Sequence, residues 1–153
     1  MRRARGFTLL ELLVVLVVVV IMASVAVPGF QRTIAVNRMA ADFNAVLTGL
    51  NYARSEAIKR RAEVTFEVTE DRPWVYRVKV DDEVLRERRG QNARTSLSKL
   101  SLSFDHLGKP VTGSNCPVEC RLTLSSSHDG IEDRMLEVSR QGRVGRRSGD
   151  DES

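Results

Sequence analysis

The chain opens with a short polar segment that leads into an uninterrupted apolar stretch, residues 12–27. A helix over residues 7–27 would be about 31 Å long at about 1.5 Å per residue, close to the hydrocarbon thickness of a bilayer. Arg2, Arg3 and Arg5 precede it and bias the N-terminus towards the cytoplasm. The pattern therefore predicts a membrane-spanning helix, with the rest of the chain on the other side of the membrane.

A single carboxylate, Glu11, lies within this segment near its start. An unpaired charge in the hydrocarbon region costs on the order of 2.5 kcal/mol or more. Acids embedded in a membrane usually have a partner, so we expect Glu11 to pair with a cationic group.

An amphipathic pattern follows the apolar stretch over residues 31–61, where apolar residues recur at helical spacing. Pro28 and Gly29 separate the two patterns and predict a kink or a local break rather than a new domain. We therefore expect one long, bent helix over residues 7–61 whose second half lies against a sheet. The apolar positions are Val36, Met39, Phe43, Val46, Leu47, Leu50, Ala53, Ala57 and Ile58, and the expected outward positions are Asn37, Thr48, Asn51, Ser55 and Lys59.

After Arg61 the apolar period changes from 3.6 to 2, which is typical of half-buried strands. Strands are expected at residues 64–68, 74–80, 84–88, 100–104, 121–125 and 135–139. A turn is expected at residues 70–73, and loops at residues 90–96 and 108–120. The pattern predicts a helix followed by six or seven antiparallel strands, with the single tryptophan, Trp74, in the core.

The N-terminal residues Arg5-Gly6-Phe7-Thr8-Leu9-Leu10-Glu11-Leu12, followed by a valine- and leucine-rich stretch and Pro28, resemble a known signal. They are similar to the class III signal and N-terminal helix of type IV pilins and type II secretion pseudopilins. The resemblance implies that a prepilin peptidase cuts after Gly6 and methylates the new N-terminus, Phe7. It also implies that Glu11 pairs with the N-terminal amine of a neighbouring subunit in a filament.

Residues 53–60, Ala-Arg-Ser-Glu-Ala-Ile-Lys-Arg, also resemble a signature of the GspH/FimT branch of minor pilins and pseudopilins. In that family a β-rich globular domain follows the long helix. The resemblance implies an α+β, pilin-like fold in which the helix packs on a C-terminal antiparallel β-sheet or β-sandwich domain. The expected divisions are a leader peptide at 1–6, a transmembrane and filament-core helix at 7–29, its amphipathic continuation at 30–61, a β-rich domain at 62–147 and an acidic tail at 148–153.

Two other interpretations of the N-terminus remain open. A secretory signal peptide would also have an arginine-rich start, and Ser24-Val25-Ala26 offers a small-residue cleavage site, although Glu11 would fall inside its hydrophobic region. A plain single-span anchor would leave Glu11 without a role.

Two cysteines, Cys116 and Cys120, lie four positions apart. On the far side of the membrane the compartment would be oxidising, which favours a disulfide that closes a small loop. A zinc site formed with His106 and His128 is the alternative, but these histidines lack the close spacing of known zinc modules.

The 153-residue chain has a formal charge of +4, and 20 of its 24 basic residues are arginine. Four arginines, Arg140, Arg143, Arg146 and Arg147, lie within eight residues of one another near the C-terminus, among glycines that would let the backbone follow a curved surface. Such a cluster suits sequence-independent binding to phosphates. It also resembles the "GRxR" tail of FimT-type minor pilins, which implies DNA binding, although the additional Gly145 shifts the register.

A structural interpretation of the same segment stays open. Residues 142–144 would form the last edge of the sheet, and Arg146 and Arg147 would belong to a solvated tail balanced by the acidic residues Asp150, Asp151 and Glu152.

No recognisable nucleophile or metal motif is present, and both histidines are expected in surface turns, so we predict no enzymatic activity, cofactor or metal. The resemblance implies a minor type IV pilin in the bacterial inner membrane, with a single span, a periplasmic globular domain and assembly into a pilus. The implied partners are the prepilin peptidase, other pilins or pseudopilins, and DNA taken up in natural transformation. The alternative is a minor pseudopilin of a type II secretion system.

Overall fold

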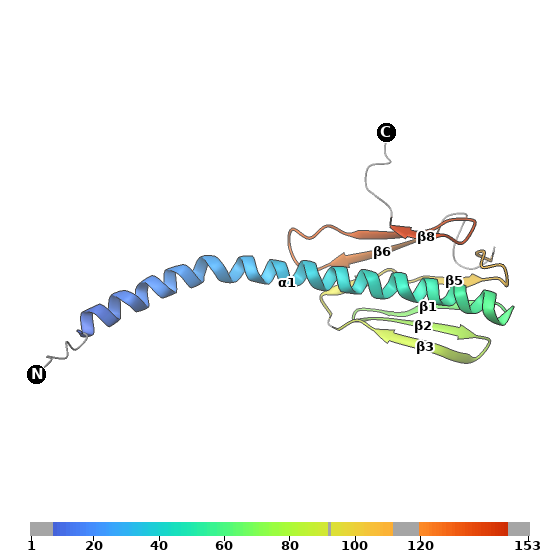
Figure 1. Ribbon diagram of the computed structural model, residues 1–153, viewed down its shortest axis with the longest axis horizontal. Coiled ribbons are helices and arrows are strands. Elements are labelled where there is room, and N and C mark those ends of the chain that lie inside the picture. The colour runs from blue at the N-terminus through green and yellow to red at the C-terminus, as the bar shows by residue number, and fades with distance from the viewer. Residues whose placement is uncertain (1–7, 92, 112–119, 147–153) are drawn as a thin grey trace, which may run out of the picture. The chain divides into compact units, whose positions relative to one another are not determined.

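The computed structural model describes residues 8–91, 93–111 and 120–146 (Figure 1). The chain forms two compact units, one up to Val36 and one from Asn37 onward. Helix α1 (Leu9–Arg60) begins in the first unit and ends in the second. The described residues therefore confirm the predicted helix over nearly its whole length, while Phe7 lies outside them.

The start of α1 is capped by Thr8. Its hydroxyl oxygen Oγ1 accepts a hydrogen bond from the backbone N–H of Glu11 at 3.2 Å, and its carbonyl oxygen accepts from the N–H of Leu12 at 3.3 Å. These are the bonds of an N-cap residue, which satisfy backbone donors that have no partner inside the helix. The helix start is thus fixed by the residue that precedes the apolar run.

The break considered at Pro28 does not occur, because α1 runs through Pro28 and Gly29 without interruption. Proline removes one hydrogen bond from the helical ladder, and the ladder continues on both sides of it. A few residues later the hydroxyl of Thr33 donates to the carbonyl oxygen of Gly29 at 3.1 Å. The two sequence patterns therefore belong to one continuous element.

The end of α1 is a left-handed cap. Arg61 has a φ of 53°, and the N–H of Ala62 donates to the carbonyl oxygen of Ala57 at 3.3 Å. This bond is the one that closes a Schellman motif, which satisfies a carbonyl of the last turn and reverses the chain. The chain then enters the first strand.

The second half of α1 buries one face, as its apolar spacing predicts. The predicted outward residues Asn37, Thr48, Asn51, Ser55 and Lys59 are all exposed. Two of the predicted apolar positions, Val36 and Ile58, are also exposed, at 39% and 47%. The buried stripe consists of Met39, Phe43, Val46, Leu50, Ala53 and Ala57.

The described residues form two four-stranded antiparallel sheets, and the second half of α1 runs along them (Figure 1). The first sheet has the order β3-β2-β1-β5 and contains β1 (Val64–Asp71), β2 (Trp74–Val80), β3 (Glu83–Arg89) and β5 (Ser101–Phe104). The second has the order β4-β6-β7-β8 and contains β4 (Thr95–Leu97), β6 (Cys120–Ser126), β7 (Arg134–Val138) and β8 (Val144–Arg146). This arrangement confirms the predicted α+β class.

Two strands differ from the prediction. The prediction of a loop at residues 90–96 was wrong at its end, because β4 begins at Thr95 and pairs with β6. Thr95 is buried, and its hydroxyl donates to the carboxylate of Asp42 on α1. A strand with so short an apolar pattern has little local signal, and this one is specified by partners far away in the sequence. The other strand, β8, lies at the edge of the sheet as the structural interpretation expected, but it covers Val144–Arg146 rather than residues 142–144.

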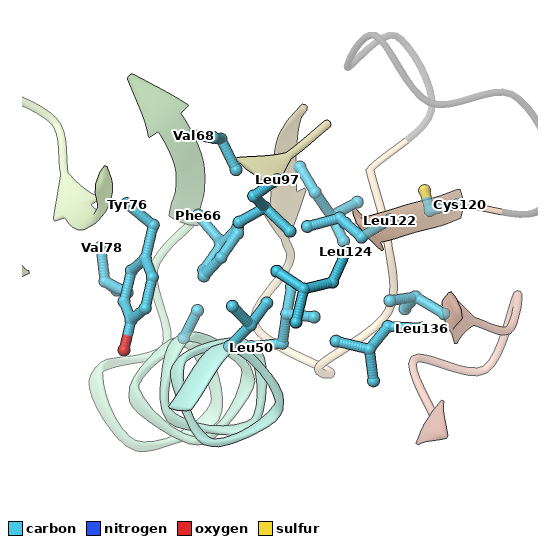
Figure 2. Packing of buried hydrophobic residues seen from close by; sticks show 14 of the residues in the cluster. Leu50, Phe66, Val68, Tyr76, Val78, Leu97, Cys120, Leu122, Leu124 and Leu136 are labelled. Carbon is cyan, nitrogen blue, oxygen red and sulfur yellow. The ribbon is translucent and has the colours of Figure 1, made fainter. Parts of the chain in front are cut away.

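The core lies between α1 and both sheets. Figure 2 shows Leu50 of α1 beside Phe66 of the first sheet and Leu124 of the second. Trp74 is buried, as predicted, and its ring stacks on that of Tyr76 with centroids 5.9 Å apart. The Tyr76 hydroxyl donates to the carbonyl oxygen of Ala45 at 3.2 Å, and burial raises the pKa of this tyrosine. These contacts hold the helix on the first sheet.

Candidate functional site

The first candidate is the N-terminal part of α1, whose apolar side chains are exposed all round. Large apolar side chains at residues 9–30 have exposed fractions between 49% and 82%. By length and composition this helix can cross a membrane, and no part of its most apolar window is buried within the described chain. So much apolar surface requires lipid or neighbouring helices to cover it.

Glu11 is the one charged residue among residues 9–30. Its backbone N–H is bonded to Thr8, whereas its carboxylate forms no ion pair within the described part of the chain. The carboxylate is therefore available to a group from outside this chain. Gly6 and Phe7, the predicted cleavage and methylation positions, lie outside the described residues, so the pairing with a neighbour's amine stays a prediction.

The second candidate is the arginine hairpin, which we define as residues 139–146, the turn between β7 and β8 together with β8. The N–H of Gly142 donates to the carbonyl oxygen of Ser139 at 2.8 Å, and the N–H of Ser139 donates to the carbonyl oxygen of Arg143 at 2.9 Å. Gly142 has a φ of 77°, which completes the three-residue type of hairpin loop. This tight turn places Arg140 and Arg143 on either side of its tip.

The hairpin is anchored to α1 through Gly142. A Cβ atom added to this glycine would lie 1.8 Å from the carbonyl oxygen of Gly108, and that oxygen accepts a hydrogen bond from Nε of Arg54 at 3.1 Å. Gly142 is therefore needed for close packing, a role different from the flexibility that the sequence suggested. Gly145, which lies in β8, has no such neighbour within 4 Å.

Arg140, Arg143 and Arg146 are all exposed. None of the three forms an ion pair with an acidic residue in the described ranges, in contrast to Arg77, whose guanidinium pairs with Glu87. Arg146 lies in β8, at the edge of the second sheet, and not in a tail. The structure therefore brings three of the four predicted arginines onto one hairpin, while Arg147 and the acidic residues after it lie outside the described residues.

The signature at residues 53–60 has a structural role that the hydrophobic pattern of the sequence did not indicate. Arg54 reaches the loop at Gly108, and Glu56 is 8% exposed. Nε of Arg60 donates to Oε2 of Glu56 at 2.8 Å, and this hydrogen bond lowers the pKa of the Glu56 carboxyl. Arg60 also lies 3.7 Å from the carboxylate of Glu83 on β3. The signature thus connects the end of α1 to β3 of the first sheet and to the loop that follows β5 of the same sheet, through polar contacts.

The remaining candidate residues lie apart from these sites. His106 is exposed in the turn after β5, and His128 is half-buried between β6 and β7 with Nδ1 3.1 Å from the carbonyl oxygen of Asp129. Among the described residues, no three histidine, cysteine or acidic side chains come together as metal ligands. Cys120 is buried at the start of β6 and is not a free thiol, whereas Cys116 lies outside the described residues, so the pairing of the two stays a prediction.

Two family models match the chain. The model described as type II transport protein GspH matches residues 42–142, and the model described as prokaryotic N-terminal methylation motif matches residues 1–27. The first match ends at Gly142, so Arg143 and Arg146 lie beyond it. A search of curated protein sequences gives no match.

Two crystal structures of the type IV minor pilin FimU from Pseudomonas aeruginosa have a similar fold. The first is 19% identical in sequence, with a TM-score of 0.61 over 77% of this chain and 91% of FimU. The second, in another crystal form, is 22% identical, with a TM-score of 0.56 over 72% of this chain and 90% of FimU. At these identities the similarity establishes the fold.

Proposed function

Because the chain belongs to the type II transport protein GspH family, we propose that it is a minor pilin subunit that passes from the inner membrane into a filament. The family and the fold are those of pilin structural subunits, not enzymes. The N-terminal methylation motif implies processing by a prepilin peptidase and assembly with other pilins. In this proposal the cut follows Gly6 and the methyl group is added to the amine of Phe7.

Before assembly the N-terminal part of α1 holds the protein in the inner membrane as a single span, with the globular unit in the periplasm. Its exposed apolar surface supports this role, since lipid or other pilin helices would cover it. In the filament, Glu11 pairs with the methylated amine of a neighbouring subunit. The carboxylate without an ion pair in the described chain supports this pairing, because a buried ammonium and carboxylate together cost far less than either alone.

The specific role that we favour is DNA capture for natural transformation, through Arg140, Arg143, Arg146 and Arg147. The observation that carries it is the exposed arginine hairpin, in which three guanidinium groups have no acidic partner in the described ranges. Each planar guanidinium can bind a phosphate through two hydrogen bonds. The hairpin is also held on the globular unit by Gly142 and Gly108, so binding would not have to order a loose tail.

The second candidate is a minor pseudopilin in a type II secretion system. The description of the matching family model favours it, and it requires the same helix, the same processing and the same fold. In that case the arginine hairpin would contact other subunits or exported protein rather than DNA.

The DNA-binding role and the pseudopilin role can be separated by measuring how the full chain, in detergent micelles, binds DNA at different salt concentrations. In a variant with Arg143, Arg146 and Arg147 changed to Gln, the slope of log affinity against log salt should become less steep by about 0.9 for each phosphate that is no longer neutralised. The control is Arg77→Gln, which removes one charge from an arginine that already pairs with Glu87 and should leave the slope nearly unchanged. Unchanged binding in the triple variant would remove the hairpin from the DNA proposal and favour the pseudopilin role.

A further inference from the structure

A small pocket lies on the globular unit between α1 and the adjoining ends of β2 and β3. Its volume is about 70 Å³, enough for a group the size of a carboxylate with an accompanying water. Arg38 and Asp42 of α1, Trp74 of β2 and Arg88 of β3 are among the residues that line it. The pocket is separate from the arginine hairpin, which belongs to the second sheet.

Trp74 presents an unusual feature in this pocket. The residue is 1% exposed, and its indole Nε1–H has no hydrogen-bond acceptor among the described residues. A buried indole N–H normally has a partner, so this donor requires an explanation. The ring packs closely on Gly90, where an added Cβ atom would lie only 2.6 Å from Nε1, and it also stacks on the ring of Tyr76. These two neighbours restrict its rotation.

The charges around this donor favour an anion. Arg38, Arg88 and Arg89 line the pocket together with one carboxylate, Asp42. Arg89 is paired with Glu70 at 3.4 Å, and Asp42 accepts the hydroxyl of Thr95. Arg38 and Arg88 have no ion pair within the described part of the chain. Counting the three arginines against the two carboxylates leaves one positive charge in excess.

We propose that this pocket binds a single acidic side chain, aspartate or glutamate, carried by a partner polypeptide. Nε1 is covered in the unbound protein, so the side chains over it move aside as the carboxylate enters, and one carboxylate oxygen then accepts from Nε1–H of Trp74. Arg38 of α1 and Arg88 of β3 neutralise the charge. The proposal does not depend on DNA binding by the hairpin or on which filament the protein joins.

A carboxylate fits this pocket better than the backbone of duplex DNA does. The acceptor must reach a donor that is almost completely covered, and a carboxylate on a flexible side-chain stem can enter a narrow opening. A phosphate of duplex DNA is fixed in the backbone of the helix and cannot extend from it to reach a covered donor.

The test uses the fluorescence of Trp74, the single tryptophan of the chain, in the full-length protein in detergent micelles. The probe is a short peptide with blocked ends and one central glutamate, and the matched control is the same peptide with glutamine. A saturable change with the glutamate peptide, absent with the glutamine peptide, is the expected result. Arg88→Gln and Arg38→Gln should each weaken binding by about tenfold or more, because each removes a charge-assisted hydrogen bond.

Arg77→Gln is the matched protein control, because Arg77 lies on the face of β2 opposite to Trp74 and pairs with Glu87. This variant should bind the glutamate peptide as tightly as the unchanged protein does. Thermal unfolding of each variant verifies that the exposed arginines are not needed for folding. Equal responses to the two peptides, no saturable response, or full binding by the Arg38 and Arg88 variants would overturn the proposal. So would a response confined to inorganic phosphate or duplex DNA, since the occupant would then be a phosphate.

Discussion

At the scale of single residues, Gly142 joins the arginine hairpin to the rest of the globular unit. Its positive φ and its approach to the carbonyl oxygen of Gly108 leave no room for a side chain. Arg54 completes the contact by donating to the same oxygen. The position of the three exposed arginines therefore depends on a glycine that is buried among them.

Gly142→Ala is expected to destabilise the globular unit by more than about 2 kcal/mol, through the cost of left-handed backbone and the clash with Gly108. This corresponds to a fall in melting temperature of about 8 °C or more, which can be followed by Trp74 fluorescence. The control is Gly145→Ala, three residues along the same hairpin, where the added Cβ meets nothing within 4 Å. Equal melting temperatures for the two variants would contradict this role of Gly142.

The sequence predicted the role of a single residue where the polarity of its side chain conflicts with that of its neighbours along the chain. Glu11 is an acid among apolar residues, and a conflict of that kind indicates a missing partner from the amino-acid sequence alone. The role of Arg54 could not be inferred in this way, because an arginine on a helix is ordinary until the loop that holds Gly108 is placed beside it.

At the scale of elements, α1 combines two surfaces in one continuous helix. Its first part exposes apolar side chains in all directions, whereas its second part buries a single stripe against the sheets. The sequence predicted both surfaces, the first from its uninterrupted apolar run and the second from helical spacing, because both are local properties of the sequence. Strand pairing is not local, and residues 95–97 pair with residues 124–126 in β6. The short strand β4 was therefore missed, and the order of the strands could not be predicted.

Glu11→Ala tests the role of the first part of α1. The Thr8 cap should persist in this variant, because Thr8 accepts from the backbone N–H of residue 11 and not from its side chain. The change thus removes the carboxylate alone, and the variant should still be processed. Loss of a buried ion pair costs about 3–5 kcal/mol, so we expect at least about a hundredfold less of the variant in sheared filaments.

The matched control is Thr8→Val, which removes the cap and keeps Glu11. Its cost should be about 1 kcal/mol of local helix stability, and it should still enter filaments once processed. Immunoblots of the membrane and filament fractions measure both variants. Normal incorporation of Glu11→Ala would show that the carboxylate has no pairing role.

At the scale of the whole molecule, the two units have different tasks. In the proposed function, the apolar unit supplies the anchor and the assembly helix. The globular unit carries the two surfaces proposed for binding, the arginine hairpin on the second sheet and the Trp74 pocket beside the first. The sequence predicted the fold class and the family because both depend on strong local patterns, the N-terminal motif and the signature at residues 53–60. It could not predict the pocket, whose walls come from segments far apart in the chain.

The central claim is that the chain matures as a pilin, and the most direct test is the N-terminal residue of the protein purified from its native membrane. Mass spectrometry of the N-terminal peptide should find Phe7 as the first residue, carrying one added methyl group on its amine. A mature protein that retains Arg2, Arg3 and Arg5, or one that begins at Val27 after loss of the whole apolar segment, would contradict the account.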